Sequence, residues 1–538
     1  MLVLEPAMAD ARVSVLEAKL ARKPGRLSLI IFAAVLLGGI AYTGGSLLSD
    51  LSQLRNTPGF EFLLLGLTLA IALGFEFVNG FHDTANAVAT VIYTHSLEPH
   101  LAVVWSGLWN FIGVLTSSGA VAFGIVSLLP VELILNAGTH AGFAMIFALL
   151  FSAILWNLGT WYFGLPNSSS HTLIGSILGV GLMNQWMAPL HSGVSGVDWT
   201  QAIGVGKSLF FSPLIGFVCS ALLFLLIKRC VRDPRLYSEP VGKAPPPFWI
   251  RSMLVLTCTG VSYAHGSNDG QKGMGLIMLI LVGTVPAAYA LNHAVSGPEV
   301  QAFLAISERT GRILEHYRPA GVEAPAKIRP VLERLVSQSS MEPQTVPALT
   351  AVISRIAADV APYRALASVP IELSGNIRND MYLADEALGV VEAKHLLPLS
   401  AADAEAIRDY RRTIDRAAKF IPTWVKVAVA LALGLGTMVG WKRIVVTVGE
   451  RIGKTHLTYA QGAASEVIAM ATILAADRAG MPVSTTHVLT SGVAGTMAAN
   501  HSGLQWSTLR ALAAAWLMTL PASVALAASL FWVFRHIM

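Results

Sequence analysis

The sequence predicts an all-α, polytopic membrane protein made of two inverted-topology repeats with broken helices and re-entrant hairpins. Composition is the first reason: 54% of the 538 residues are hydrophobic, only 13% are charged, and apolar runs long enough to cross a bilayer recur along the chain. No run shows the alternation of a membrane β-barrel. The second reason is a duplicated cluster, GFHDTAN at 80–86 and GSNDGQK at 266–272, which places an Asp among small residues inside an apolar stretch of each half.

The apolar runs place the membrane segments in order. The first run, 28–48, follows a basic tail, exceeds a signal-peptide core and lacks a small-residue cleavage site, so we expect a retained helix. In the first half we further expect spans at 60–79 continuing brokenly to about 93, at 101–129 and 142–163, a Ser-rich re-entrant stretch at 166–186, and a span at 207–228. In the second half we expect 252–292, broken by its Asp cluster, then 421–441, 458–478, 482–499 and 507–535.

These runs divide the chain into segments with different roles. We expect a cytoplasmic N-terminal tail at 1–27, an extra N-terminal transmembrane helix at 28–48, a first transmembrane repeat at 60–228, a cytoplasmic linker at 229–251, the first part of the second repeat at 252–296, a polar periplasmic insert at 297–419, and the remainder of the second repeat at 420–538. The net charge of +5 reflects basic loops between apolar runs, which indicate topology and not a nucleic-acid partner.

Sidedness follows from the basic loops, which stay in the cytoplasm. The basic tail and the basic, Pro-rich linker are then both cytoplasmic, so the first Asp cluster enters the membrane from outside and the second from the cytoplasm. One span separates the insert from the basic loop at 442–454, which puts the insert outside. The insert carries no catalytic motif, and we expect a helical elaboration without its own activity. Inverted repeats with broken helices are typical of secondary transporters, whose site lies near the midplane.

A second motif follows each Asp cluster. Pro166 precedes Ser168, Ser169, Ser170 and His171, and Pro482 precedes Ser484, Thr485, Thr486 and His487, each at the same spacing. A Pro in the first turn is well placed to start a helix, and the hydroxyls would then surround its N-terminus. Free amides, the helix dipole and hydroxyls together make an anion cradle, and two cradles suit a tetrahedral oxyanion. The alternative is plain helix capping.

The Asp clusters complement these cradles. A charge at membrane depth costs at least about 2.5–3.5 kcal/mol, so both aspartates need a reason, for which polar contacts between helices are the alternative. Asp83 and Asn86 share a helix face, while Gly80 and Gly266 are expected to permit helix breaks that expose carbonyls. An Asp beside an anion is repulsive unless a proton or cation intervenes, which indicates co-transport of the anion with positive charge.

Lys272 stands where the first cluster has Asn86. It would neutralise substrate or pair with Asp269, and either role argues against a symmetric pair of sodium sites. Glu466 is a candidate coupling carboxylate, with a helix–helix hydrogen bond as the alternative. The histidines His82, His171, His265 and His487 relay protons or simply buttress the helices. The three cysteines, Cys219, Cys230 and Cys258, lack metal-ligand spacing.

Four ordered motifs, GFHDTANAVAT, GLPNSSSHTLIG, HGSNDGQKG and MPVSTTHVLTS, resemble the paired signatures of the inorganic phosphate transporter (Pit) family. The resemblance runs through the chain except the first helix and parts of the insert. It implies uptake of inorganic phosphate by cation symport, with the Asp/Asn clusters and the hydroxyl-rich tips forming the site. The HD and NDGQK variants and the insert look closest to the bacterial low-affinity branch, which is proton-driven and carries neutral metal-phosphate complexes. Lys272 departs from the second Asn of sodium-coupled members.

We therefore expect a bacterial inner-membrane symporter of phosphate and protons, with divalent metal as further cargo if phosphate travels as a neutral metal complex. The residues expected to bind substrate are Asp83, Asn86, Ser168, Ser169, Ser170, Asn268, Asp269, Lys272, Ser484, Thr485 and Thr486, and those expected to couple transport are Asp83, Asp269, His82, His265 and Glu466. The alternatives are a sodium-coupled phosphate or sulfate symporter of the same fold and, in another class, an anion channel. We find no enzyme motif and expect no cofactor, no metal ligands and no nucleic-acid partner. Membrane lipid is expected to surround the protein, and the oligomeric state stays open, a homo-oligomer included.

Overall fold

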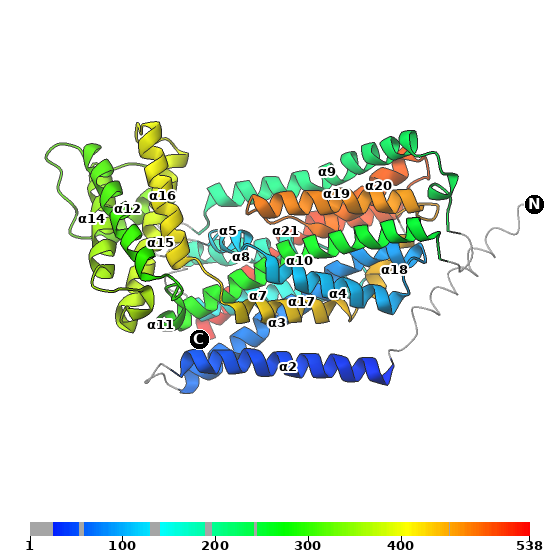
Figure 1. The fold of residues 1–538 in the computed structure, drawn as a ribbon, viewed down its shortest axis with the longest axis horizontal. Helices are drawn as coiled ribbons and strands as arrows, with labels where there is room; N and C mark the ends of the chain where they lie inside the picture. The colour runs from blue at the N-terminus through cyan, green and yellow to red at the C-terminus, as the bar shows by residue number, and fades with distance from the viewer. Residues whose placement is uncertain are drawn as a thin grey trace, which may run out of the picture.

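The computed structural model describes residues 25–52, 59–129, 140–188, 196–240, 245–450 and 452–537. Throughout these ranges the regular elements are helices, apart from one isolated bridge between Gly453 and Leu504 (Figure 1). Five helices are long and apolar enough to cross a membrane, and two bent helix pairs would raise the number of spans to seven. The predicted all-α, multi-pass fold is confirmed over the part of the chain that is described.

The first half contains the extra helix and the first set of membrane helices. Its elements are α2 (Arg26–Leu51), α3 (Gly59–Tyr93), α4 (Pro99–Thr116), α5 (Ala120–Val126), α7 (His140–Tyr162), α8 (Ser169–Met187) and α9 (Trp199–Cys230), followed by a 3₁₀ turn at Pro234–Leu236.

The second half begins with α10 (Phe248–Thr284) and the short α11 (Pro286–Tyr289). The insert then supplies α12 (Gly297–His316), α13 (Ile328–Gln338), α14 (Thr345–Val360), a 3₁₀ turn at Leu366–Ser368, α15 (Ile371–Ala393) and α16 (Ala401–Ala418). The remaining membrane helices are α17 (Thr423–Thr437), α18 (Lys442–Glu450), α19 (Tyr459–Arg478), α20 (Thr485–Ala499) and α21 (Trp506–Ile537).

Each half packs mainly on the other. Helix α3 lies on α17 and α10 lies on α4, while α8 lies on α21 and α20 lies on α9. The short helices follow the same rule, since α5 contacts α10 and α18 contacts α3. The two halves therefore interlock, and neither could bury its polar motifs alone.

The expected helix breaks at Gly80 and Gly266 are wrong. Helices α3 and α10 run unbroken through both positions. The glycines serve close packing instead: a Cβ on Gly80 would lie 2.2 Å from the carbonyl oxygen of Leu433, and one on Gly266 would lie 2.1 Å from that of Asn110. A missing side chain lets two backbones touch, and this brings the Asp-bearing helices against their neighbours.

The observed bend in the first half lies elsewhere. The span expected at 101–129 is divided into α4 and α5, which meet at 77°. Gly119, the residue before α5, has a φ of +89°, in the left-handed region that glycine adopts without a steric penalty. The chain therefore turns at Gly119 and not at the Asp cluster.

The insert forms a helical unit at one end of the bundle, opposite the end at which α2 begins (Figure 1). Its core includes the stacked rings of Phe303 and Tyr410, whose centroids lie 6.0 Å apart. At the junction with the bundle, buried Asp385 accepts hydrogen bonds from Arg411 (2.8 Å) and Lys419 (2.6 Å). These cations hold the pKa of Asp385 below its ordinary value despite the burial. The neighbouring Glu386 differs, because loss of hydration raises its pKa from 4.5 to about 7.

We expect Gly80→Ala to destabilise the protein, because the added methyl group would overlap the Leu433 carbonyl. Overpacking of this kind typically costs about 1–3 kcal/mol. The matched control is Gly74→Ala on the same helix, where a Cβ meets no atom within 4 Å. The control should be neutral or stabilising, since alanine favours helix interiors by about 1 kcal/mol. Thermal unfolding in detergent measures both, and equal melting temperatures for the two variants would contradict the packing role.

We expect Glu386→Gln to raise the melting temperature at pH 8 and to leave it unchanged near pH 4. The folded-state pKa of Glu386 lies above its ordinary value, so the folded protein holds this proton longer than the unfolded chain. The resulting stability is complete below the ordinary value and is lost as pH rises through about 7. The Glu386→Gln variant has no carboxyl group to ionise at this position, so it does not lose this stability at high pH. A pH series of melting curves tests this, and a difference that grows toward acid pH would contradict it.

Candidate transport site

The two Asp clusters meet inside the bundle. Asp83 on α3 and Asp269 on α10 are buried, and with buried His265 they place one oxygen or nitrogen atom each within 4.8 Å of one another. The close packing at Gly80 and Gly266 brings each helix against the opposite half of the chain. The structure thus joins two motifs that lie far apart in the sequence.

Lys272 is fully buried and bonded on two sides. Its Nζ lies 2.6 Å from Asp269 Oδ2, one helical turn away, and it donates a hydrogen bond to Ser170 Oγ at the start of α8. Ser170 in turn donates to the carbonyl oxygen of Val483, 2.7 Å away, in the segment before α20. Of the two roles considered for Lys272, pairing with Asp269 is the one observed.

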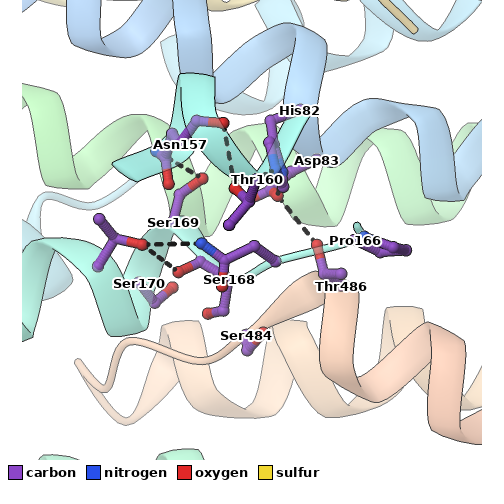
Figure 2. Close-up of polar contacts among 12 residues, drawn as sticks. His82, Asp83, Asn157, Thr160, Pro166, Ser168, Ser169, Ser170, Ser484 and Thr486 are labelled. Atoms are coloured by element: carbon purple, nitrogen blue, oxygen red, sulfur yellow. Dashed lines mark hydrogen bonds and ion pairs between the residues drawn. The ribbon is translucent and has the colours of Figure 1, made fainter. Parts of the chain in front are cut away.

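Asp83 is bound by the hydroxyl-rich N-terminus of α20, just as Lys272 is bound by that of α8; these two helix ends are called the tips below. Thr486 at the start of α20 donates a hydrogen bond of 2.9 Å to Asp83 Oδ1, and His82 Nδ1 lies 3.1 Å from the same oxygen (Figure 2). The other ring nitrogen of His82 lies 3.2 Å from Thr160 Oγ1 on α7. Each helix tip therefore reaches the charged cluster carried by the opposite half.

The six hydroxyls of the two triplets divide their roles. Ser168 and Ser484 are N-caps, accepting hydrogen bonds from the amides of His171 (3.2 Å) and His487 (3.1 Å). For these two residues plain capping is the observed role. Ser169 accepts a bond of 3.4 Å from the Asn157 amide, whereas the buried Thr485 hydroxyl has no hydrogen-bond partner among the described residues.

The prolines do not start the helices as expected. Ser168 and Ser484 are the N-cap residues, so Pro166 and Pro482 precede the caps by two residues and lie outside the first turn. The prediction failed because the hydroxyl of the N-cap residue accepts a hydrogen bond from a free backbone amide of the first turn. Each proline lies two residues earlier, in the segment that leads into the helix.

Asn268 stabilises the hairpin formed by α19 and α20. Its amide donates to the carbonyl oxygen of Met481 (3.1 Å) and its oxygen accepts from the Val483 amide (3.4 Å). The side chain thus holds the turn between α19 and α20 in place. The side chain of Asn86, expected to bind substrate, lies outside the described residues, although its backbone belongs to α3.

The histidines lie at two places. His265 Nδ1 lies 2.7 Å from Asn110 Oδ1, and its Nε2 lies 3.6 Å from Asp269 Oδ2. The rings of His171 and His487 contact each other across the two tips, with centroids 4.6 Å apart. The first histidine faces the charged cluster, and the second pair joins the halves.

The structure does not bring Glu466 to the cluster. This buried carboxylate on α19 accepts a hydrogen bond from Thr257 on α10. Thr257 precedes Asp269 by twelve residues, which is roughly 18 Å along a helix at 1.5 Å per residue. The helix–helix hydrogen bond considered as the alternative is therefore present, and a coupling role for Glu466 stays a prediction.

Sequence reasoning missed two carboxylates at the site. Glu76 on α3 is fully buried, lies against the Gly273 backbone and interacts electrostatically with Lys272. It stands seven residues before Asp83, two turns along the same helix face, which is the signal that could have found it. Asp477 on α19 accepts hydrogen bonds from Ser267 (2.7 Å) and Gln271 (2.5 Å), so it anchors the second Asp cluster.

The fold and this cluster define a class of protein: a multi-pass membrane protein with buried charged groups between two interlocked halves. The family model described as "Phosphate transporter family" matches residues 79–527, and the chain belongs to this family. It is a transporter and not an enzyme, as predicted, and the family and the apolar helices fit the predicted location in a bacterial inner membrane.

The curated relatives are consistent with this membership. The chain is 40% identical to the low-affinity inorganic phosphate transporters PitA and PitB of Escherichia coli (strain K12), covering 88% of this chain and 96% of each relative. It is 38% identical to a low-affinity inorganic phosphate transporter of Buchnera aphidicola. A solved structure described as "The sodium-dependent phosphate transporter" shares 18% identity and a TM-score of 0.49, over 88% of this chain and 100% of that one.

We expect Lys272→Met to cost about 3–5 kcal/mol, because it leaves Asp269 buried without its cation. Adding Asp269→Asn should recover part of that loss, since the unpaired charge is then gone. The exposed Lys228, which donates to Asn500 and lies 5.8 Å from the centre of the Phe224 ring, provides the control Lys228→Met, with little expected effect. Thermal unfolding in detergent completes the double-mutant cycle. Additive losses would show that the two residues are energetically independent.

Proposed function

We propose that the protein takes up inorganic phosphate by symport with protons through the site between α3, α10 and the tips of α8 and α20. One observation carries the proposal: two buried aspartates from opposite halves lie together with a single buried lysine and the two hydroxyl-rich tips. The names of the relatives, which are inorganic phosphate transporters, support the choice of substrate.

The charges favour coupling to positive charge. Asp83, Asp269 and Glu76 gather around one ammonium group, that of Lys272. When ionised, these carboxylates would repel an oxyanion. Protons or cations must therefore enter with phosphate, and they would leave with it on the other side.

The hydrogen-bond pattern favours a proton in particular. The Asn110 carbonyl oxygen can only accept, so His265 Nδ1 carries a hydrogen toward it. A neutral His265 would then point the lone pair of Nε2 at Asp269, 3.6 Å away. A proton on either group removes this repulsion. The pair is thus a natural place to hold a transported proton.

Phosphate itself would be bound by donors. The Lys272 ammonium donates to Ser170, the Ser170 hydroxyl to the Val483 carbonyl oxygen and the Thr486 hydroxyl to Asp83. The Thr485 hydroxyl is buried without a partner among the described residues. The free amides and dipoles of α8 and α20 add positive potential. An oxyanion here would exchange these internal bonds for bonds to its own oxygens.

A metal-coupled form is the second candidate. The oxygens of Asp83 and Asp269 and a nitrogen of His265 lie close enough to ligate one cation, which would travel as cargo with phosphate. A sodium-driven cycle would use the same atoms. Against a symmetric pair of sodium sites stands Lys272, because its ammonium already occupies the cation position beside Asp269.

The orientation of the halves is part of the proposal. The exchanged packing partners, α3 on α17 against α10 on α4, are those expected of two inverted copies. In Figure 1 the α9–α10 connection lies at the same end as the start of α2, and the insert lies at the other end. With the basic tail and linker inside, the insert faces the periplasm.

An anion channel is the alternative from another class. It would need a continuous aqueous path and no acid at the site, whereas Asp83, Asp269 and Lys272 are all buried here. A sulfate carrier would share the cradle. Competition between phosphate and sulfate for uptake separates these substrates.

We expect phosphate uptake into proteoliposomes to be driven by an inward proton gradient and to fall at least tenfold in Asp83→Asn and in Asp269→Asn. Each change removes a buried carboxylate that is proposed to carry positive charge with the anion. The matched control is Asp233→Asn in the linker, where the partly exposed carboxylate forms an ion pair with Arg235, its one ion pair among the described residues. Labelled phosphate entry measures the rate, with sodium and magnesium as separate additions.

The outcomes separate the candidates. Uptake that needs sodium and ignores the pH gradient would refute proton coupling, and uptake that needs magnesium would favour the metal complex. Parental rates in both Asp variants would show that the carboxylates are structural. Current without pH or cation coupling would establish a channel.

A further inference from the structure

A second polar cavity lies where the insert meets the membrane bundle. Its volume is about 490 Å³, and it is lined by the α4–α5 bend, by one face of α10, and by α15 and the end of α16. It is separate from the transport site, since none of the clustered residues Asp83, His265 and Asp269 lines it. The side chains that give it a chemical character are basic and acidic groups of the insert.

Arg378 is the distinctive residue of this cavity. It is only 8% exposed, and its Nε has no hydrogen-bond partner among the described residues. The guanidinium group lies 5.1 Å from the centre of the Tyr382 ring, and its hydrogen bond to Asn379, the one it makes among the described residues, is long at 3.4 Å. A buried cation without a carboxylate partner is costly, so its retention needs a ligand to explain it.

The other charges of the cavity leave this arginine unmatched. Arg411 and Lys419 are both held by Asp385, and Lys419 also pairs with Asp415. The lining carries four basic side chains, Arg378, Arg411, Arg416 and Lys419, against the three acidic ones Asp385, Glu386 and Asp415. Glu386 has a pKa of about 7 and so carries only part of a negative charge at neutral pH. The net charge of the lining is therefore positive, which favours the binding of an anion.

We propose that this cavity is a second anion-binding site, in which the Arg378 guanidinium holds inorganic phosphate before it reaches the transport site. The planar guanidinium presents parallel N–H groups that match two oxygens of a tetrahedral oxyanion. The cavity is larger than one such ion, which would therefore keep part of its water shell. The choice of phosphate rests on the proposed function, whereas the oxyanion chemistry rests on Arg378 alone.

The short helix α5 links the wall of the cavity to the second Asp cluster. Its wall includes Gly119 and Ala120 at the start of α5. In the same helix the amide of Val121 donates a hydrogen bond of 2.9 Å to Gln271, the residue beside Lys272. A phosphate ion in the cavity is thus one helix away from the cluster that would carry it, and the site would raise the local concentration of substrate there.

The test is protection from chemical labelling. Ser118 lines the cavity and is exposed, so Ser118→Cys provides a thiol for a charged alkylating reagent. Exposed Cys230 and half-buried Cys219 are replaced by serine. Every protein also carries Lys272→Met together with Asp269→Asn, which removes the ammonium donor of the proposed transport site without leaving an unpaired buried charge. Labelling is followed in purified full-length protein in detergent, with inorganic phosphate added in steps and with chloride as the ionic-strength control.

We expect phosphate to slow labelling, and Arg378→Gln to raise the half-protecting phosphate concentration at least tenfold. The matched control Arg334→Gln changes an exposed insert arginine that pairs with Glu342 outside the cavity, and it should leave protection unchanged. Arg378→Met keeps the apolar stem and removes a buried unpaired charge, so it should fold with an unchanged or higher melting temperature while losing protection as well.

Equal protection in the parent and both Arg378 variants, or no protection by phosphate at all, would overturn the proposal. Because the transport site is disabled throughout, these outcomes do not depend on phosphate uptake. Failure of uptake in the proteoliposome assay alone would refute the proposed function and leave the second site standing. Protection by sulfate at the same concentrations would show a general oxyanion site and overturn its assignment to phosphate.

Discussion

The contact between Lys272 and Asp269 is the interaction on which the rest of the site depends. Both groups are fully buried, 2.6 Å apart, in a helix that runs through the bundle. In such surroundings each charge offsets much of the cost of burying the other. Lys272 also bonds Ser170, so the pair fixes the tip of α8 as well as α10. The position of the first hairpin is thereby tied to a charge in the second half.

The site exists only between the two halves. Thr486 from the second half bonds Asp83 of the first, while Ser170 from the first half bonds Lys272 of the second. These two hydrogen bonds place the hydroxyl groups of each half beside the charged side chains of the other half. The glycines that let α3 and α10 approach α17 and α4 make this arrangement geometrically possible. Gly80 and Gly266 thus serve both the close packing of the helices and the meeting of the charged side chains.

Apolar periodicity predicted the membrane helices and motif pairing predicted the meeting of the two Asp clusters, whereas the family was indicated by the resemblance of four motifs. They did so because apolar length and buried charge leave few alternatives in a bilayer. They failed at Gly80 and Gly266, since a glycine used for a break and one used for close packing look alike in a sequence. Glu76 and Arg378 were missed because their role depends on which distant residues they do or do not contact, and only tertiary structure determines that.

The contact between the rings of His171 and His487 has a consequence for the transport cycle. With the two helix tips in contact and every described member of the charged cluster buried, an ion can reach the cluster only if some of these contacts separate. Because His171 lies on α8 and His487 on α20, this ring contact would have to break whenever the two halves separate at their tips.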